Sequence, residues 1–294
     1  MTAATLKSFS ARRKGSAEIP RRDIHFNLDG VDVRNWNPHG SHVSHLLNAL
    51  SITFPEGEKF FIESARYFKD QLANNPKLLE ELQGFIGQEA MHGREHRVLN
   101  AKIEEAGYPA ERLEAESMKL LRKASGKNPL RKLAATCALE HFTAILADVL
   151  LRNPDLIPEG THAEMRAMWN WHAVEENEHK AVCFDVYQSV ATGPMAYIRR
   201  VETMLMVTAL FWQRIVKNQM VLIRQDGTQR DWKQWAAVAR FAFTKPGALR
   251  RLAKPYLDYF KPGFHPWQHD NRALLAAVKT RYDQREAEEL ALAA

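Results

Sequence analysis

The chain has 294 residues, 45% hydrophobic and 26% charged, which is typical of a globular protein with one large domain or two small ones. Its two cysteines, Cys137 and Cys183, are too few for a disulfide framework or a cysteine-type zinc site, and they favour a reducing, cytoplasmic setting. The formal charge of +6 is concentrated late in the chain, which leaves nucleic acid and anionic membranes as candidate partners.

Residues 1–40 show no regular period, and we expect an irregular N-terminal tail. Residues 1–22 contain basic side chains without an apolar stretch, so they predict disorder and argue against a signal peptide. Beyond them helical periods dominate, separated by Pro and Gly clusters, which predicts an all-α fold. The expected helices cover residues 55–73, 77–106, 111–123, 130–151, 162–191 and 195–224, followed by shorter helical pieces.

Two carboxylates compete for an inward position in the first expected helix, which contains FPEGEKFFIESARYF. Glu58 continues a line of apolar residues, whereas Glu63 shares its face with Lys59, Tyr67 and Asp70. Residues three or four apart lie on one face of a helix. We therefore choose Glu58 as the inward residue and keep Glu63 in reserve.

The second expected helix carries GQEAMHGREH, in which Glu89, His92 and His96 follow one another at steps of three and four. These steps place all three on the leucine-rich face of the helix, where the core should lie. An unpaired carboxylate buried there costs on the order of several kcal/mol. A bound cation would neutralise that charge.

The helix expected over residues 162–191 repeats this spacing in WHAVEENEHKAVCF, with Glu176 and His179 three residues apart. Its extra histidine, His172, lies four residues before the pair, whereas His96 lies four residues after the earlier pair. In antiparallel helices His96 and His172 would come to the same height. The helix between them contributes an inward Glu140.

Bundle-type di-iron and di-manganese proteins take one Glu from each of two helices and a Glu-x-x-His pair from each of the other two. The chain has these residues in the same order, which predicts two divalent metal ions, with iron favoured and manganese or zinc as alternatives. His96 and His172 are either further ligands or hydrogen-bond partners of ligands. The predicted metal-binding residues are Glu58, Glu89, His92, His96, Glu140, His172, Glu176 and His179.

Five motifs, FPEGEKFF, GQEAMHGREH, ALEHFTA, WHAVEENEHK and PGFHPW, resemble the bacterial family described as predicted metal-dependent hydrolases, which is placed near the ferritin-like proteins. The resemblance spans about residues 20–270 and implies a hydrolase. With the helical pattern, it predicts a ferritin-like four-helix bundle with a dimetal core over residues 41–192. Additional C-terminal helices over residues 193–294 would pack on this bundle.

Residues 197–262 carry thirteen Lys or Arg against four Asp or Glu, a net charge of +9, interleaved with aromatic residues. This mixture is typical of a face that contacts an anionic membrane, with a solvated helix surface as the alternative. Nucleic acid is less favoured because no base-reading motif accompanies the charge. The residues expected at the membrane surface are Arg199, Arg200, Trp232, Trp235, Phe243, Lys245, Arg250, Arg251 and Lys254.

Three functions are open from the sequence. A carboxylate-rich dimetal site favours a non-haem di-iron oxidase or oxygenase that acts on an apolar, acyl or lipid, substrate. Its cavity would be lined by residues such as Phe61, Phe85, Met168 and Cys183. A hydrolase using metal-bound hydroxide is the alternative, and a metal-storage or structural protein is the third. We expect a cytoplasmic protein at the inner membrane surface, with a homodimer among the open oligomeric states.

Overall fold

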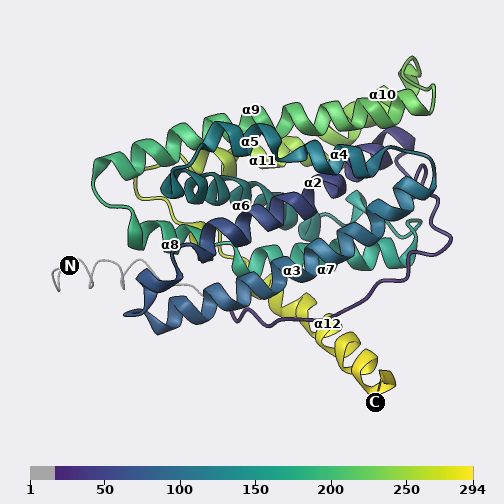
Figure 1. The fold of residues 1–294 in the computed structure, drawn as a ribbon. Helices are drawn as coiled ribbons and strands as arrows, with labels where there is room; N and C mark the ends of the chain where they lie inside the picture. Colours follow the sequence, from purple (N-terminus) through teal and green to yellow (C-terminus); the bar gives the residue numbers. More distant parts are fainter. Residues whose placement is uncertain (1–16, 294) are drawn as a thin grey trace.

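The computed structural model describes residues 17–293, and the regular secondary structure in that range is helical throughout (Figure 1). The all-α prediction is confirmed. Four long helices form the centre of the fold, with α2 packed on α3, α6 packed on α7, and the two pairs in contact with each other. These are α2 (Ser41–Arg66), α3 (Pro76–Glu105), α6 (Pro129–Arg152) and α7 (Ala163–His179).

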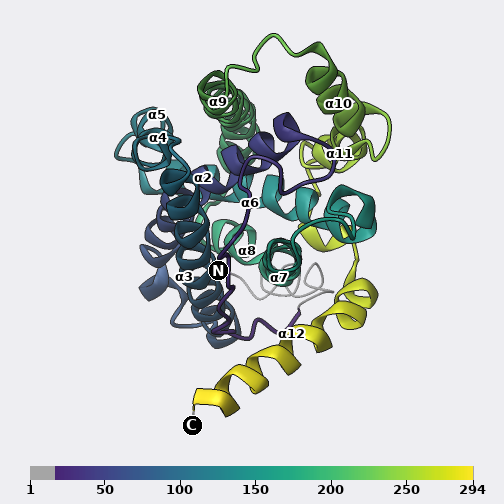
Figure 2. The ribbon, with the colours of Figure 1, turned by 90° about the vertical axis from the view of Figure 1, so that its right-hand side faces the viewer.

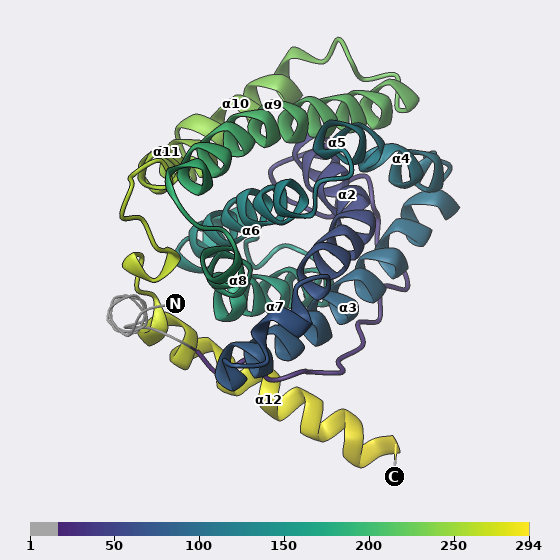
Figure 3. The ribbon, with the colours of Figure 1, turned by 60° about the vertical axis from the view of Figure 1, so that its left-hand side comes forward.

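The remaining helices surround these four. α9 lies along α2 and α6. α10 packs on α2, α11 packs on α6, and α10 and α11 also contact each other. α12 contacts α7 and ends away from the bundle (Figure 2, Figure 3). Their bounds are η1 (Lys69–Leu72), α4 (Ala110–Ser117), α5 (Lys119–Ser125), η2 (Pro154–Leu156), α8 (Val182–Val190), α9 (Pro194–Gln225), α10 (Trp232–Phe243), α11 (Ala248–Asp258), η3 (Pro266–Gln268) and α12 (Arg272–Ala293).

Two turns that the sequence suggests as helix ends are also helix starts. In NNP, the Asn75 side chain accepts a hydrogen bond from a backbone N–H of the first turn of α3, and Pro76 is its first residue. In GKNP, Asn128 and Pro129 do the same for α6. An Asn cap satisfies a free N–H group and Pro favours the helical backbone angle. Local sequence therefore determines where both of these helices begin.

The predicted start of the first core helix is wrong. α2 begins at Ser41 and continues through Pro55, the expected first residue. Proline has no backbone N–H, so inside a helix the carbonyl four residues earlier loses its hydrogen-bond donor. This destabilises the helix by about 3 kcal/mol. Here that carbonyl belongs to Ser51, and the side-chain amide of Asn100 on α3 donates to it at 3.4 Å. A contact from the neighbouring helix thus replaces part of the lost bonding.

The helix expected over residues 162–191 is divided in two. α7 ends at His179, and α8 begins at Val182 after a turn at Lys180. The Lys180 ammonium group donates to the backbone carbonyl of His269, in the segment between η3 and α12. α8 packs on α6 and α3, so the apolar stripe predicted for one long helix stays inside the fold.

Residues 17–40, the described part of the chain before α2, contain no helix, as expected, but they pack against the bundle. Extended backbone directs alternate side chains to opposite sides, and every second residue over 22–28 is buried: Arg22, Ile24, Phe26 and Leu28. Gln88 of α3 also donates to the backbone carbonyl of Pro20. The disordered tail predicted for residues 1–22 is therefore wrong over residues 17–22, and residues 1–16 lie outside the described range.

One helix of the described chain, α6, is long and apolar enough to cross a membrane by length and composition alone. Within the fold, 83% of that apolar stretch is buried. A core helix of a globular protein has the same composition, and α6 packs on both α7 and α9. Its apolar character therefore matches its central position.

Candidate metal centre

The eight predicted metal-binding side chains converge between α2, α3, α6 and α7, and each is at most 4% exposed. One ligand atom from each of Glu58, Glu89 and His92 lies within 4.8 Å of the others. The same holds for Glu89, Glu140 and His179. Glu89 belongs to both groups and therefore lies between the two sets of ligand atoms.

Glu63, the reserve candidate, lies outside this cluster. Its side chain is 49% exposed and forms an ion pair with Arg122 at 2.7 Å. Glu58, on the inner face of the same helix, is 2% exposed. The apolar line along the helix therefore distinguished the inward carboxylate from the outward one.

The buried ligand atoms lack partners of their own. The carboxylate oxygens of Glu58, Glu89 and Glu140 accept no hydrogen bond. Three further buried atoms also have no hydrogen-bond partner: Oε2 of Glu176, Nδ1 of His92 and Nε2 of His179. Desolvating such groups without a partner is costly. Carboxylate oxygen and imidazole nitrogen are donors that iron, manganese and zinc accept. The residues present therefore fit metal ions held between them.

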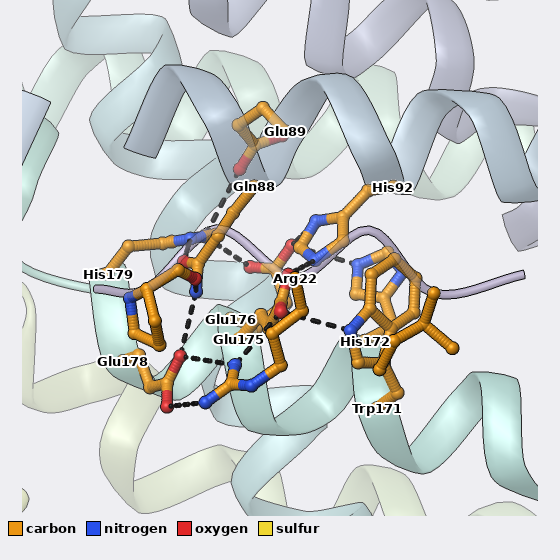
Figure 4. Close-up of polar contacts among 12 residues, drawn as sticks. Arg22, Gln88, Glu89, His92, Trp171, His172, Glu175, Glu176, Glu178 and His179 are labelled. Atoms are coloured by element: carbon orange, nitrogen blue, oxygen red, sulfur yellow. Dashed lines mark hydrogen bonds and ion pairs between the residues drawn. The ribbon is translucent and has the colours of Figure 1, made fainter. Parts of the chain in front are cut away.

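Hydrogen bonds behind two of the histidines orient them towards the centre (Figure 4). The Nε2–H of His92 donates to Glu175 at 3.0 Å, which leaves Nδ1 facing the cluster. The Nδ1–H of His179 donates to Gln88 at 2.9 Å, which leaves Nε2 at 3.1 Å from Glu89. Such partners fix the ring orientation and tautomer of metal-binding histidines.

The two extra histidines meet at the same height, as predicted for antiparallel helices. His96 Nε2 lies 2.6 Å from His172 Nδ1. The Ser51 hydroxyl donates its only proton to Asn100, so in its hydrogen bond with His96 it must accept the Nδ1–H of the ring. The other ring nitrogen of His96, Nε2, then carries the lone pair, which faces inward. Both histidines have a ligand atom within 4.8 Å of one from Glu58.

An arginine that the sequence analysis missed completes the surroundings of the cluster (Figure 4). Arg22 donates to Glu175 and to both oxygens of Glu178, each at 2.9 Å, and Glu178 accepts from Gln88 at 2.7 Å. Arg22 thus reaches His92 through Glu175. The available signals were the extra glutamates of WHAVEENEH and the alternation of apolar residues after Arg22.

The buried acids and bases have strongly displaced pKa values. Burial raises the pKa of Glu58, Glu89 and Glu140 well above the usual range. For Glu176 burial also acts upward, but the hydrogen bond from His172 and the imidazole of His179, 3.5 Å away, hold its pKa well below the usual range. Without metal, the centre therefore contains three carboxyl groups that favour the protonated form.

Two groups are expected to make the metal-free protein less stable as pH rises, Glu175 between about pH 4.5 and 8 and His179 between about pH 6.5 and 9. Burial raises the pKa of Glu175 to about 8, against the effect of Arg22. Burial lowers the pKa of His179, but its neighbours Glu140 and Glu176 raise it to about 9. Both groups hold a proton that the unfolded chain has already released, so their stabilisation disappears as pH passes these values.

Buried His92, whose pKa lies well below its usual value of 6.5, is neutral in the folded state. It opposes this loss of stability only while the unfolded chain still releases its histidine proton, up to about pH 7.5. Metal binding displaces protons from its ligands. Thermal unfolding of the metal-loaded and metal-free forms should therefore show a Tm difference that widens between pH 6.5 and 9. A constant difference would contradict this electrostatic account.

Over residues 20–270 the chain matches the family described as "Predicted metal-dependent hydrolase". The chain belongs to this family. The resemblance drawn from the five motifs is confirmed, and the family description agrees with the buried His and Glu groups that are able to hold metal. No curated protein and no solved structure matches the chain.

The chain has an apolar cavity of about 110 Å³ beside the candidate metal centre. His172 and Glu176 form part of its wall. The lining expected from the sequence is wrong, because the apolar residues proposed for it belong to the packed core instead: Phe61, Phe85, Met168 and Cys183. The apolar residues that line the cavity include Leu46, Leu50, Phe54, Leu146, Trp169, Phe241 and Leu249.

The C-terminal region of this family member exposes only part of the predicted membrane-contacting set. Arg200 is buried, with its guanidinium 5.0 Å from the centre of the Tyr259 ring, so it cannot meet lipid head groups. The Trp235 ring is partly buried against His42. Trp232 is 71% exposed, and the others with exposed side chains are Phe243, Lys245, Arg250, Arg251 and Lys254.

Proposed function

We propose that the protein is a non-haem dimetal oxidase or oxygenase, with iron as the favoured metal, that acts on an apolar, acyl-type substrate. The observation that carries the proposal is the apolar cavity whose wall includes His172 and Glu176. A hydrocarbon chain in this cavity would lie against the metal centre while all eight metal-binding side chains remain shielded from solvent.

Side chains from α2, α3, α6 and α7 would together bind two ions. Glu58 and His92 would hold one ion, Glu140 and His179 the other, and Glu89 would lie between them. When bound, a carboxylate-bridged pair of iron ions supplies oxidation of hydrocarbon by dioxygen. The chain's own contribution is to orient the imidazoles, exclude water and place the substrate chain.

The family description favours hydrolysis as the second candidate, in which the ions would activate water. A hydrolase needs a route for water and polar groups to hold the scissile bond. The cavity wall offers few such groups, Thr143 among them, beyond His172 and Glu176. This composition suits an apolar chain better than an ester or amide.

Metal analysis and oxygen uptake test the proposal together. Protein purified without added metal should contain about two iron ions per chain, and with a reductant it should consume oxygen when a long-chain substrate is added. Zinc or manganese content, together with cleavage of long-chain esters and no oxygen uptake, would instead support the hydrolase. Catalytic oxygen consumption or catalytic ester cleavage would each contradict a role in metal storage.

We also propose that the α10–α11 region contacts an anionic membrane, at the inner surface of a cytoplasmic membrane. Trp232 and Phe243 of α10 are 71% and 59% exposed, and Leu257 of α11 is 63% exposed. Exposed basic residues flank them, including Lys245 and Arg250. The same two helices form part of the cavity wall, so an acyl chain would enter from the lipid side.

Charge reversal of Lys245 and Arg250 to Glu is expected to weaken binding to anionic liposomes at least tenfold, because each cation contributes about 1 kcal/mol near such a surface. Added salt should weaken binding further. Sedimentation with phosphatidylserine-containing vesicles measures both effects. Lys69→Glu is the matched control, since this exposed lysine lies on η1, beyond the opposite end of α2. Retardation of DNA without liposome binding would assign the basic face to nucleic acid.

A further inference from the structure

A second, polar cavity of about 360 Å³ lies beside the apolar one. Val149 of α6 belongs to the walls of both, so the two cavities adjoin. α11 covers both of them: Leu249 lines the apolar cavity, and Arg251 and Lys254, further along the same helix, line the polar one.

The polar cavity carries an excess of positive charge. Its wall contains four cationic side chains, Arg152, Lys180, Arg251 and Lys254, and two acidic ones, Asp148 and Asp258.

Both acidic groups already have basic partners. Asp148 pairs with Arg152 at 2.8 Å, and Asp258 pairs with His269 at 2.9 Å. Among the side chains that the structure describes, no carboxylate forms an ion pair with Arg251 or Lys254. These two cations are available to an anionic ligand.

The polar cavity also lies close to the metal centre along the chain. Lys180 directly follows His179, and His141 directly follows Glu140. On α7 the apolar cavity is lined by Glu176, whereas the next residue, Asn177, lines the polar cavity. The two cavities therefore lie on neighbouring faces of the same ligand-bearing helices.

We infer that the two cavities together bind one amphiphile, with a compact anionic head in the polar cavity and a hydrocarbon chain in the apolar cavity. Arg251 and Lys254 would pair with the head, and the chain would pass Val149 towards His172. The inference rests on the proposed function for the fate of the chain, but binding itself requires no turnover.

Calorimetric titration of the full-length, metal-loaded protein tests the role of the head. The probes are dodecanoate, dodecyl phosphate and the neutral dodecanol, each below its aggregation concentration. At least one anion should bind tenfold or more tightly than dodecanol, and the preferred anion distinguishes a carboxylate from a phosphate head. Equal affinity for dodecanol and both anions would overturn the inference.

Charge reversal tests the named cations. The double substitution of Arg251 and Lys254 by Glu should weaken anion binding at least tenfold and leave dodecanol binding unchanged. Arg240→Glu is the matched control, because it reverses an exposed charge on the neighbouring helix α10 but does not line either cavity. Unchanged anion affinity in the double variant would contradict the assignment.

A third variant tests the chain-binding cavity. Leu146→Trp fills the apolar cavity and should weaken binding of all three probes, while inorganic phosphate should bind as it does to the unmodified protein. Unchanged dodecanoate binding in this variant would overturn the inference. If the amphiphile binds as described but no oxygen is consumed, the oxygenase proposal fails and the binding assignment stands.

Discussion

In the proposed two-ion centre, replacement of Glu89 by Gln is expected to remove both ions, so that the metal content falls from about two per chain to near zero. Glu89 is the carboxylate shared by the group with Glu58 and His92 and the group with Glu140 and His179. A neutral amide at this position supplies neither the charge nor the second oxygen that a bridge requires. Elemental analysis after dialysis measures the loss.

The Gln side chain keeps the volume of Glu89 and removes one acid from a crowded, buried cluster. The metal-free Glu89→Gln protein should therefore unfold at a temperature equal to or above that of the metal-free parent. Glu63→Gln is the matched control, because this exposed glutamate pairs with Arg122 and lies outside the cluster. It should keep full metal and change stability by less than about 1 kcal/mol. Full metal occupancy in Glu89→Gln would contradict the ligand assignment.

Replacement of Arg22 by Ala is expected to destabilise the metal-free protein by about 3–5 kcal/mol, the usual cost of leaving a buried charge without its partner. Arg22 is fully buried between Glu175 and Glu178. Glu175 orients His92, and Glu178 shares Gln88 with His179, so both imidazoles lose support. Metal affinity should fall about 10- to 100-fold.

Urea unfolding of the metal-free protein and metal titration measure these two effects separately. Arg22→Lys restores the charge without the planar fork and should fall between the parent and Arg22→Ala. Arg21→Ala is the matched control, since Arg21 is exposed and adjacent in sequence. Parental stability together with parental metal affinity in Arg22→Ala would remove the N-terminal segment from the support of the centre.

The sequence by itself determined the all-α fold class and the composition of the buried cluster. Helical periodicity is a local property, and it relates the face of a residue directly to its spacing. Glu89, His92 and His96 share one face whatever surrounds the helix, and their position on an apolar stripe predicts burial. The same argument separated Glu58 from Glu63. Asn and Pro at the starts of α3 and α6 are equally local signals.

Only the tertiary structure decided which distant groups meet these faces. Arg22 finds Glu175 and Glu178 across more than half of the chain, and no period in the sequence encodes that pairing. α2 continues through Pro55 because a side chain of α3 contacts the carbonyl left free. Arg200 turns inward because aromatic rings enclose it. Helix spacing specifies the face of each residue, but long-range packing between helices specifies what that face touches, and so it decided the cavities, the support of the imidazoles and the exposed part of the basic region.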